Sequence, residues 1–468
     1  MERKYYDSDF KPIRNKIKKY QPLDIANIAL DELRKKEDCC TPPHPWFLFN
    51  IITWSVHFGN KDSKKKIDKK EFINLYNMVQ DFPDDESIIE RIKLSKDAHS
   101  VWWAIRSIFH QQKLYQLRNN NINILFILEL SKTINQEAAN FVKFVVLLSI
   151  SLSKNSNIFY NKKYFKTLFD SQDIDNYWNI FNITEDKLNE IAKISKDTYK
   201  NVKFEKNSMT IFSTHPLFIN NQGNLGVICY PVFKAFVRNG IYDLLIKYEM
   251  IERKKIEYEF ERIILEYTKL ECIKKSENNF IRPNSGVDGI IQEDDLLFFI
   301  ECKSSSFHKL LPQYPTQEAH FSSLKQSVLK GYKQMLSSYR KYSKQKKAFG
   351  IIVTLYDLTI GCSIEFWKHS IEKWIMSENL NEKEIEFLKK YVWVINYTEY
   401  IEILHSAKNL YDIYNKINKA LSEFSNHGSI FLEDYFSKNY RVEDIKMFGD
   451  NINEIDKLLG ISTSIERS

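Results

Sequence analysis

Residues that make turns are scarce in this chain, with only 12 Gly and 11 Pro among 468 residues. Average usage would give roughly 12% Gly plus Pro, so collagen-like repeats, propellers and folds built from many tight hairpins are excluded. Hydrophobic residues make up 43% of the chain and aromatic residues 14%, which excludes a disordered protein. The composition therefore predicts a helix-rich chain with an aromatic core, although an A/T-rich coding sequence would enrich the same residue types.

Nothing in the sequence indicates secretion or a membrane segment. Residues Met1–Tyr5 lead into polar sequence without the apolar core of a signal peptide. The longest apolar stretches, Phe47–Phe58 and Phe141–Leu152, fall short of the roughly 20 residues that span a bilayer. The six cysteines include no Cys-x-x-Cys pair, which argues against a disulfide scaffold or a structural zinc. We therefore expect a cytoplasmic protein that is not attached to a membrane.

One stretch of the sequence carries a local excess of positive charge. Residues 304–350 contain nine Lys and Arg but a single acidic residue, whereas the whole chain has a net charge of +7. From residue 351 onward, 19 acidic residues outnumber 13 basic ones. A local excess of this kind is typical of a surface that binds a polyanion.

The expected elements divide the chain into four segments. Apolar spacing predicts helices over Leu23–Glu37, Ser87–Leu117 and Asn135–Leu152 in the first of them. The segments are a helical N-terminal domain (1–206), a strand hairpin with a connecting helix (207–251), an α/β domain (252–400) and a helical C-terminal extension (401–468).

The third segment alternates helix and strand in a defined order. We expect a helix, three strands, a second helix and a fourth strand, which together indicate an α/β unit. Their ranges are Glu252–Leu270, Phe280–Arg282, Val287–Gln292, Leu296–Cys302, Gln317–Tyr342 and Ala348–Leu355.

Two carboxylates and a lysine are expected at one end of this unit. Asp288 opens one strand and Glu301 closes the next, so a hairpin between the strands would bring both to one edge of the sheet. Strand alternation places Lys303 on the same face as Glu301. Two converging carboxylates suit Mg²⁺ or Mn²⁺, which would polarise a phosphodiester and lower the pKa of a bound water. The lysine would stabilise the developing negative charge or help to deprotonate the water.

This pattern resembles the PD-(D/E)XK nuclease superfamily, the restriction-endonuclease-like proteins whose core has the order α-β-β-β-α-β. Asp288 matches the first carboxylate, and Glu301 with Lys303 matches the E-x-K motif. Glu261, or Glu257 one helical turn earlier as its substitute, matches a helix glutamate that assists the metal site in many members, whereas Val287 replaces the emblematic proline. The resemblance covers about residues 252–356.

The resemblance implies an α/β restriction-endonuclease-like core with a large, mainly α-helical N-terminal domain and a helical C-terminal extension. It also implies a metal-dependent endonuclease that hydrolyses DNA phosphodiester bonds, similar to prokaryotic restriction or anti-phage defence effectors. By the same analogy, the chain would act as a homo-oligomer or with a partner defence subunit. The sequence has no G-x-x-x-x-G-K-[ST] phosphate loop, so no nucleotide-driven motor of that type is expected in this chain.

The helix after the motif is predicted to contact the substrate. Its apolar stripe would cover the sheet, while basic side chains on the other side would face phosphates. The residues predicted to bind nucleic acid are Ser304, Lys325, Lys330, Lys333 and Arg340. Two alternatives stay open: RNA as the substrate, and a nuclease fold that binds DNA or protein without catalysis.

Overall fold

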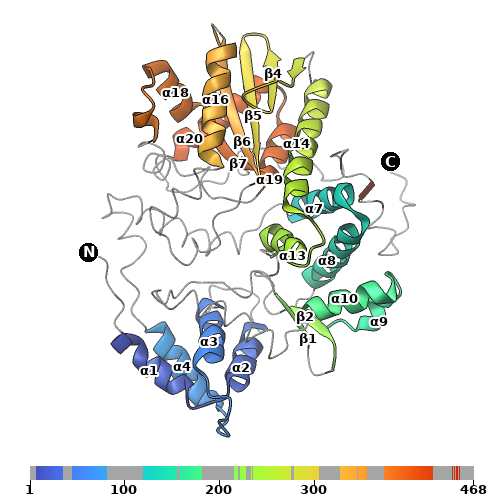
Figure 1. Cartoon of the computed structure of the whole chain (residues 1–468), viewed down its shortest axis with the longest axis vertical. Coiled ribbons are helices and arrows are strands. Elements are labelled where there is room, and N and C mark those ends of the chain that lie inside the picture. The colour runs from blue at the N-terminus through green and yellow to red at the C-terminus, as the bar shows by residue number, and fades with distance from the viewer. Residues whose placement is uncertain are drawn as a thin grey trace. The chain divides into compact units, whose positions relative to one another are not determined.

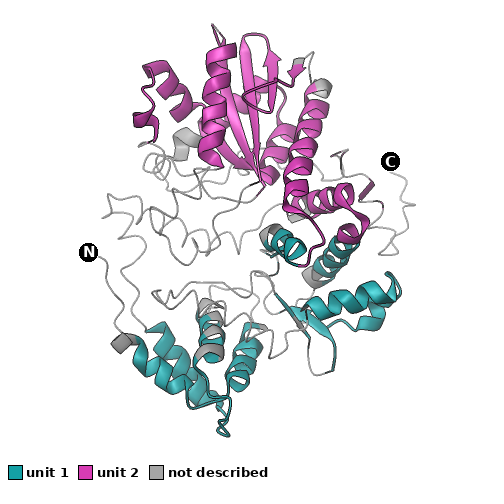
Figure 2. Cartoon of the chain, in the orientation of Figure 1, with its two compact units in different colours: residues 1–87, 110–120, 140–247 teal, residues 88–109, 121–139, 248–468 magenta. Residues whose placement is uncertain are grey.

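The computed structural model describes most of the chain in separate stretches: residues 7–34, 45–81, 120–154, 159–181, 216–219, 222–227, 236–275, 279–304, 327–344, 346–355 and 374–424, with residues 233, 445, 447, 450, 451 and 453. The chain divides into two compact units (Figure 2). Unit 1 comprises residues 1–87, 110–120 and 140–247, and unit 2 comprises residues 88–109, 121–139 and 248–468. The four-segment division stays a prediction.

Unit 1 is mainly helical in its described part (Figure 1). Its first four helices enclose one hydrophobic core, in which Phe10 packs edge-on against Trp54 with ring centroids 4.9 Å apart. The elements are α1 (Asp7–Ile17), α2 (Pro22–Arg34), α3 (Pro45–Phe58), α4 (Lys69–Gln80), α9 (Lys162–Lys166), α10 (Ser171–Phe181), β1 (Leu217–Ile219), β2 (Leu225–Val227), η2 (Phe236–Gly240) and α13 (Ile241–Lys247). Helix α8 (Gln136–Lys154) begins in unit 2 and continues into unit 1.

Unit 2 contains a five-stranded mixed sheet with the order β3-β4-β5-β6-β7. Strands β3, β4 and β5 pair antiparallel, whereas β5, β6 and β7 pair parallel. The elements are α7 (Asn120–Ile134), α14 (Arg253–Lys275), β3 (Asn279–Ile281), β4 (Gly289–Glu293), β5 (Leu296–Lys303), α16 (Val328–Tyr342), β6 (Lys347–Thr354), α18 (Glu382–Lys390), β7 (Val392–Asn396), α19 (Tyr397–Ser406) and α20 (Leu410–Phe424).

Helices lie against both faces of this sheet. Helix α16 packs on β5 and β6, where Gly331 and Gly350 leave room for close approach: a Cβ on Gly350 would lie 2.6 Å from Met335 Sδ. Cys302 points to the face opposite Lys303 because side chains alternate along β5, and it interacts electrostatically with Tyr400 of α19. Tyr267 of α14 donates a hydrogen bond to the carbonyl of Ile401, which ties α14 to α19. The mixed α/β architecture expected from the sequence is therefore confirmed.

The structure refines several expected boundaries. Strand β4 begins at Gly289, one residue after Asp288. Within the second segment, the expected connecting helix corresponds to a π-helical turn, η2, followed by α13. The helix expected over Ser87–Leu117 lies outside the described residues. Within the described part of the chain, no helix has the length and apolarity to cross a membrane.

Candidate active site

A hairpin holds Asp288 beside the end of β5. Gly289 pairs with Ile300 across the antiparallel ladder, and the N–H of Asp288 donates to the carbonyl of Ile300 at 3.0 Å. The N–H of Cys302 in turn donates to Asp288 Oδ2 at 2.8 Å. Because the backbone of each strand bonds to the other, the carboxylate of Asp288 lies next to Glu301.

Glu301 is a fully buried carboxylate at this point, with 0% of the residue exposed. Its Oε1 accepts a hydrogen bond from Lys303 Nζ, whereas its buried Oε2 has no hydrogen-bond partner among the described residues. Burial raises the pKa of Glu301 to about 8, against the opposing effect of Lys303 and with a further increase from Asp288. The protein therefore holds a carboxylate with one unsatisfied oxygen in a nearly dry environment, which is costly without a compensating charge.

Asp288 shares this electrostatic environment. Burial raises its pKa, while the hydrogen bond from the Cys302 N–H lowers it and the neighbouring charge of Glu261 raises it further. Perturbed carboxylates that influence one another are typical of functional sites. Two adjacent carboxylates that both resist ionisation would be relieved by a cation.

Lys303 is held on its other side by Gln334 of α16. Gln334 Oε1 accepts from Lys303 Nζ at 3.1 Å, and Gln334 Nε2 donates to the carbonyl of Gly286 at 2.8 Å. Sequence reasoning did not assign a role to Gln334. The sequence signal that could have indicated this role is the position of the Gln334 amide next to Met335, at the border of the buried stripe of α16.

Gly286 allows the loop before β4 to approach α16 closely. Its φ of +97° is disfavoured for residues with a side chain, and a Cβ there would lie 2.3 Å from Ser338 Oγ. Ser338 Oγ accepts a hydrogen bond from the Val287 N–H at 3.1 Å. The absence of a side chain at Gly286 thus allows the loop to contact α16.

Replacing Gly286 with Ala is therefore expected to destabilise unit 2 by about 1–3 kcal/mol, through strain and overpacking. It would also shift the carbonyl that orients Gln334, and with it Lys303. Urea unfolding measures the loss of stability. Gly223→Ala, at an open turn with a φ of +76°, provides a control for the φ strain alone, and an equal loss in both variants would contradict the close-approach argument.

Glu261 lies at the rim of the site, with about a third of its side chain exposed. Its Oε1 accepts a hydrogen bond from Arg282 at 2.7 Å. Its charge is close enough to raise the pKa of both Asp288 and Glu301. Arg282, which follows β3 and which sequence reasoning missed, engages the carboxylate predicted to complete the metal site.

The donor set at this site suits a hard divalent cation held by two carboxylates. Among the described residues, no group of three or more His, Cys, Asp and Glu side chains is arranged to hold a metal. Mg²⁺ commonly keeps several waters and binds through only one or two carboxylates. The unsatisfied Oε2 of Glu301 beside Asp288 is the feature that a cation would complete. The residues present therefore fit Mg²⁺ or Mn²⁺ with two direct protein ligands.

The residues predicted to bind nucleic acid are in different situations. Lys333 forms an ion pair with Glu378 at 3.2 Å, and Arg340 forms two hydrogen bonds with Glu384, at 2.6 and 3.1 Å. Lys330 is exposed and has no ion pair with a described residue. The remaining two are Ser304, half-buried directly after β5, and Lys325, outside the described residues. Their role in nucleic-acid binding stays a prediction, and Lys330 is the member whose charge is most available.

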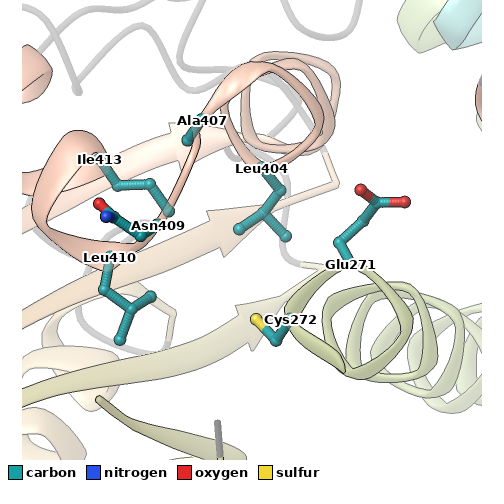
Figure 3. A pocket seen from close by; sticks show the side chains of 7 residues that line it. All are labelled: Glu271, Cys272, Leu404, Ala407, Asn409, Leu410 and Ile413. Carbon is teal, nitrogen blue, oxygen red and sulfur yellow. The ribbon is translucent and has the colours of Figure 1, made fainter. Parts of the chain in front are cut away.

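A small cavity elsewhere in unit 2 is separate from these carboxylates. It lies among α14, α19 and α20 (Figure 3), has a volume of about 10 Å³, and is lined by Glu271, Cys272, Leu404, Ala407, Asn409, Leu410 and Ile413. At about 1.5 Å of rise per residue, Glu271 lies roughly 15 Å along α14 from Glu261. The cavity has room for a single water and offers no substrate site.

The candidate active site thus consists of Asp288, Glu301 and Lys303, with Glu261, Arg282 and Gln334 around them. Comparison with known proteins identifies no relative, because no family model, no curated protein and no solved structure matches this chain.

Proposed function

We propose that this chain is a metal-dependent endonuclease with a restriction-endonuclease-like core of the PD-(D/E)XK type. The element order α14-β3-β4-β5-α16-β6 supports this fold. The observation that carries the proposal is the buried, half-satisfied carboxylate of Glu301, which lies beside Asp288 and Lys303 at the end of β5.

In this proposal Asp288 and Glu301 hold the cation, and Glu261 contributes negative charge from the rim. Bound Mg²⁺ or Mn²⁺ would supply Lewis acidity to the phosphodiester. Glu301 and Gln334 hold the ammonium group of Lys303 in place by accepting its hydrogen bonds. From there the ammonium would stabilise negative charge that develops on the phosphate oxygens; to act instead as the base that accepts a proton from the attacking water, Lys303 would have to be in its neutral amine form. Burial of the ion pair between Glu301 and Lys303 keeps bulk water from weakening these electrostatic interactions.

DNA is the substrate that we propose, and defence against invading DNA is the process. Lys330 of α16 would contact the phosphate backbone, in an assembly with another copy of the chain or with a partner subunit. RNA remains a second candidate because nothing in the described site recognises a 2′-hydroxyl or its absence. A catalytically silent binding module is disfavoured, because the complete Asp288, Glu301 and Lys303 set would have no reason to persist.

Cleavage assays with the purified protein test the proposal directly. Plasmid DNA, linear DNA and RNA are incubated with Mg²⁺, with Mn²⁺ or with EDTA. We expect DNA cleavage that requires the metal, and a loss of about a hundredfold or more in Lys303→Ala. Lys383→Ala, at an exposed position of α18, serves as the matched control and should cut normally. Equal cleavage by wild type and Lys303→Ala would refute the site, and the absence of cleavage with either metal would favour the binding module.

A further inference from the structure

The fold of unit 1 assembles a second, denser basic surface. Residues 10–21 and 59–71, which we call the basic platform, contain eleven Lys and Arg against three Asp and Glu. This excess of eight positive charges on 25 residues is larger than the net charge of +7 on the whole chain. The first of the two stretches contains no acidic residue at all.

Backbone contacts hold the two stretches of the platform side by side. The N–H of Asn60 donates to the carbonyl of Tyr20 at 3.0 Å, and Ser63 Oγ donates to the carbonyl of Lys19 at 2.7 Å. An ion pair between Lys16 and Glu71 joins α1 to α4, and Ile67 anchors the intervening loop in the core. The positive charges therefore occupy a fixed arrangement.

Most of the platform's cations are available to a partner. Of its three acidic residues, Asp68 caps α4 by accepting from the Glu71 N–H, and Glu71 is paired with Lys16. The exposed lysines that form no ion pair with a described residue include Lys18, Lys19, Lys64, Lys66, Lys69 and Lys70. Little acidic charge within the platform opposes their field.

The apolar residues of the platform show what kind of polyanion it fits. Ile13, Ile17 and Ile67 are buried, so these stretches offer no large aliphatic side chain for insertion into a lipid surface, which peripheral membrane helices use. Phe10 and Tyr20 are buried as well, so no aromatic ring is presented for stacking on the bases of a single strand. What remains is a set of ammonium groups suited to a regularly spaced phosphate backbone.

We propose that the basic platform binds the phosphate backbone of double-stranded nucleic acid, independently of base sequence. The platform belongs to unit 1 and the carboxylates to unit 2, so this binding does not depend on the proposed chemistry. The chain would then bind double-stranded nucleic acid whether or not a strand is cut.

The test measures binding of the full chain to a short fluorescent DNA duplex by anisotropy, in EDTA so that cleavage does not interfere. Salt is varied between about 50 and 200 mM, because each phosphate contact contributes about 0.9 to the slope of log affinity against log salt. The test variant is Lys64→Gln/Lys66→Gln/Lys69→Gln. We expect its affinity at the lowest salt to fall about tenfold or more, and its slope to decrease by about two to three.

The matched control is Lys163→Gln/Lys383→Gln/Lys408→Gln, which removes three exposed lysines outside the platform. Its affinity and slope should stay close to those of wild type. A second variant, Lys18→Gln/Lys19→Gln, alters the other stretch of the platform and should also weaken binding, even if the triple variant folds poorly. Circular dichroism monitors folding.

Three results would overturn the proposal. The first is that the platform variants bind duplex with unchanged affinity and unchanged salt slope. The second is that the control variant loses as much affinity for duplex as the platform variant. The third is that the platform variants lose binding only to single-stranded DNA or to vesicles rich in anionic lipid. Since none of these measurements involves cleavage, failure of the nuclease proposal and failure of the platform proposal are distinguishable.

Discussion

Asp288→Asn is expected to lower the rate of DNA cleavage on the order of a thousandfold. The asparagine amide oxygen can still accept the hydrogen bond that the Cys302 N–H gives to Asp288 at 2.8 Å, so the hairpin should remain folded. The substitution removes the negative charge that, together with Glu301, would hold the cation. Cleavage of supercoiled plasmid over time measures the rate, and calorimetric titration with Mn²⁺ measures the accompanying loss of metal affinity.

The β4–β5 hairpin itself provides the control for this variant. Asp294 lies in the turn at the other end of the hairpin, is exposed, and has a φ of +51°, a conformation that asparagine also tolerates. Asp294→Asn therefore makes the same chemical change on the same two strands without touching the site. Comparable cleavage by Asp288→Asn and Asp294→Asn would show that Asp288 holds no catalytic cation.

Glu301→Gln is expected to stabilise the metal-free protein at alkaline pH, although it removes activity. The pKa of Glu301 is raised from 4.5 to about 8 in the folded state, mainly by burial. The folded state therefore holds a proton that the unfolded state has released between about pH 4.5 and 8, and wild-type stability falls as pH rises through this window. Glutamine is neutral throughout, so its advantage grows from near zero at pH 4.5 to about 3–5 kcal/mol above pH 8.

Urea unfolding of both proteins in EDTA, at several pH values, measures this difference. Glu257 lies on the exposed side of α14, so Glu257→Gln should show the same pH profile as wild type. A stability difference between Glu301→Gln and wild type that does not change with pH would contradict the assignment of Glu301 as a buried carboxyl group with a raised pKa. A result as expected would show that the site lowers the stability of the fold that carries it.

Most of the sheet could be predicted from local sequence. The apolar run Leu296–Ile300 and the acidic turn before it define β5 and its hairpin with β4, and the mostly apolar run Val392–Asn396 defines β7. These signals are local because strand alternation and turn chemistry act over a few residues. The same locality explains why Asp288 and Glu301 could be placed at one end of the sheet.

The surroundings of the site could not be predicted in this way. Gln334 reaches Lys303 across 31 positions of sequence, and Arg282 reaches Glu261 across 21. Arg340 had the sequence signature of a free surface cation, yet Glu384 engages it from 44 positions away. Such pairings depend on how the helices pack, and the local sequence around a charged residue does not indicate which distant residue it contacts.

The mixed pairing of the sheet also has a consequence for the order in which the chain folds. Strands β4 and β5 are joined by a two-residue turn, so the hairpin that brings Asp288 to Glu301 needs almost no loop closure. Pairing of β5 with β6 is parallel and must wait for the crossover that contains α16, and non-local parallel pairing is intrinsically slow. We therefore expect the carboxylate pair to form while still hydrated, and to lose its water only when α16 docks and Gln334 engages Lys303. Docking of α16 would then be the folding step that raises the proton affinity of Glu301.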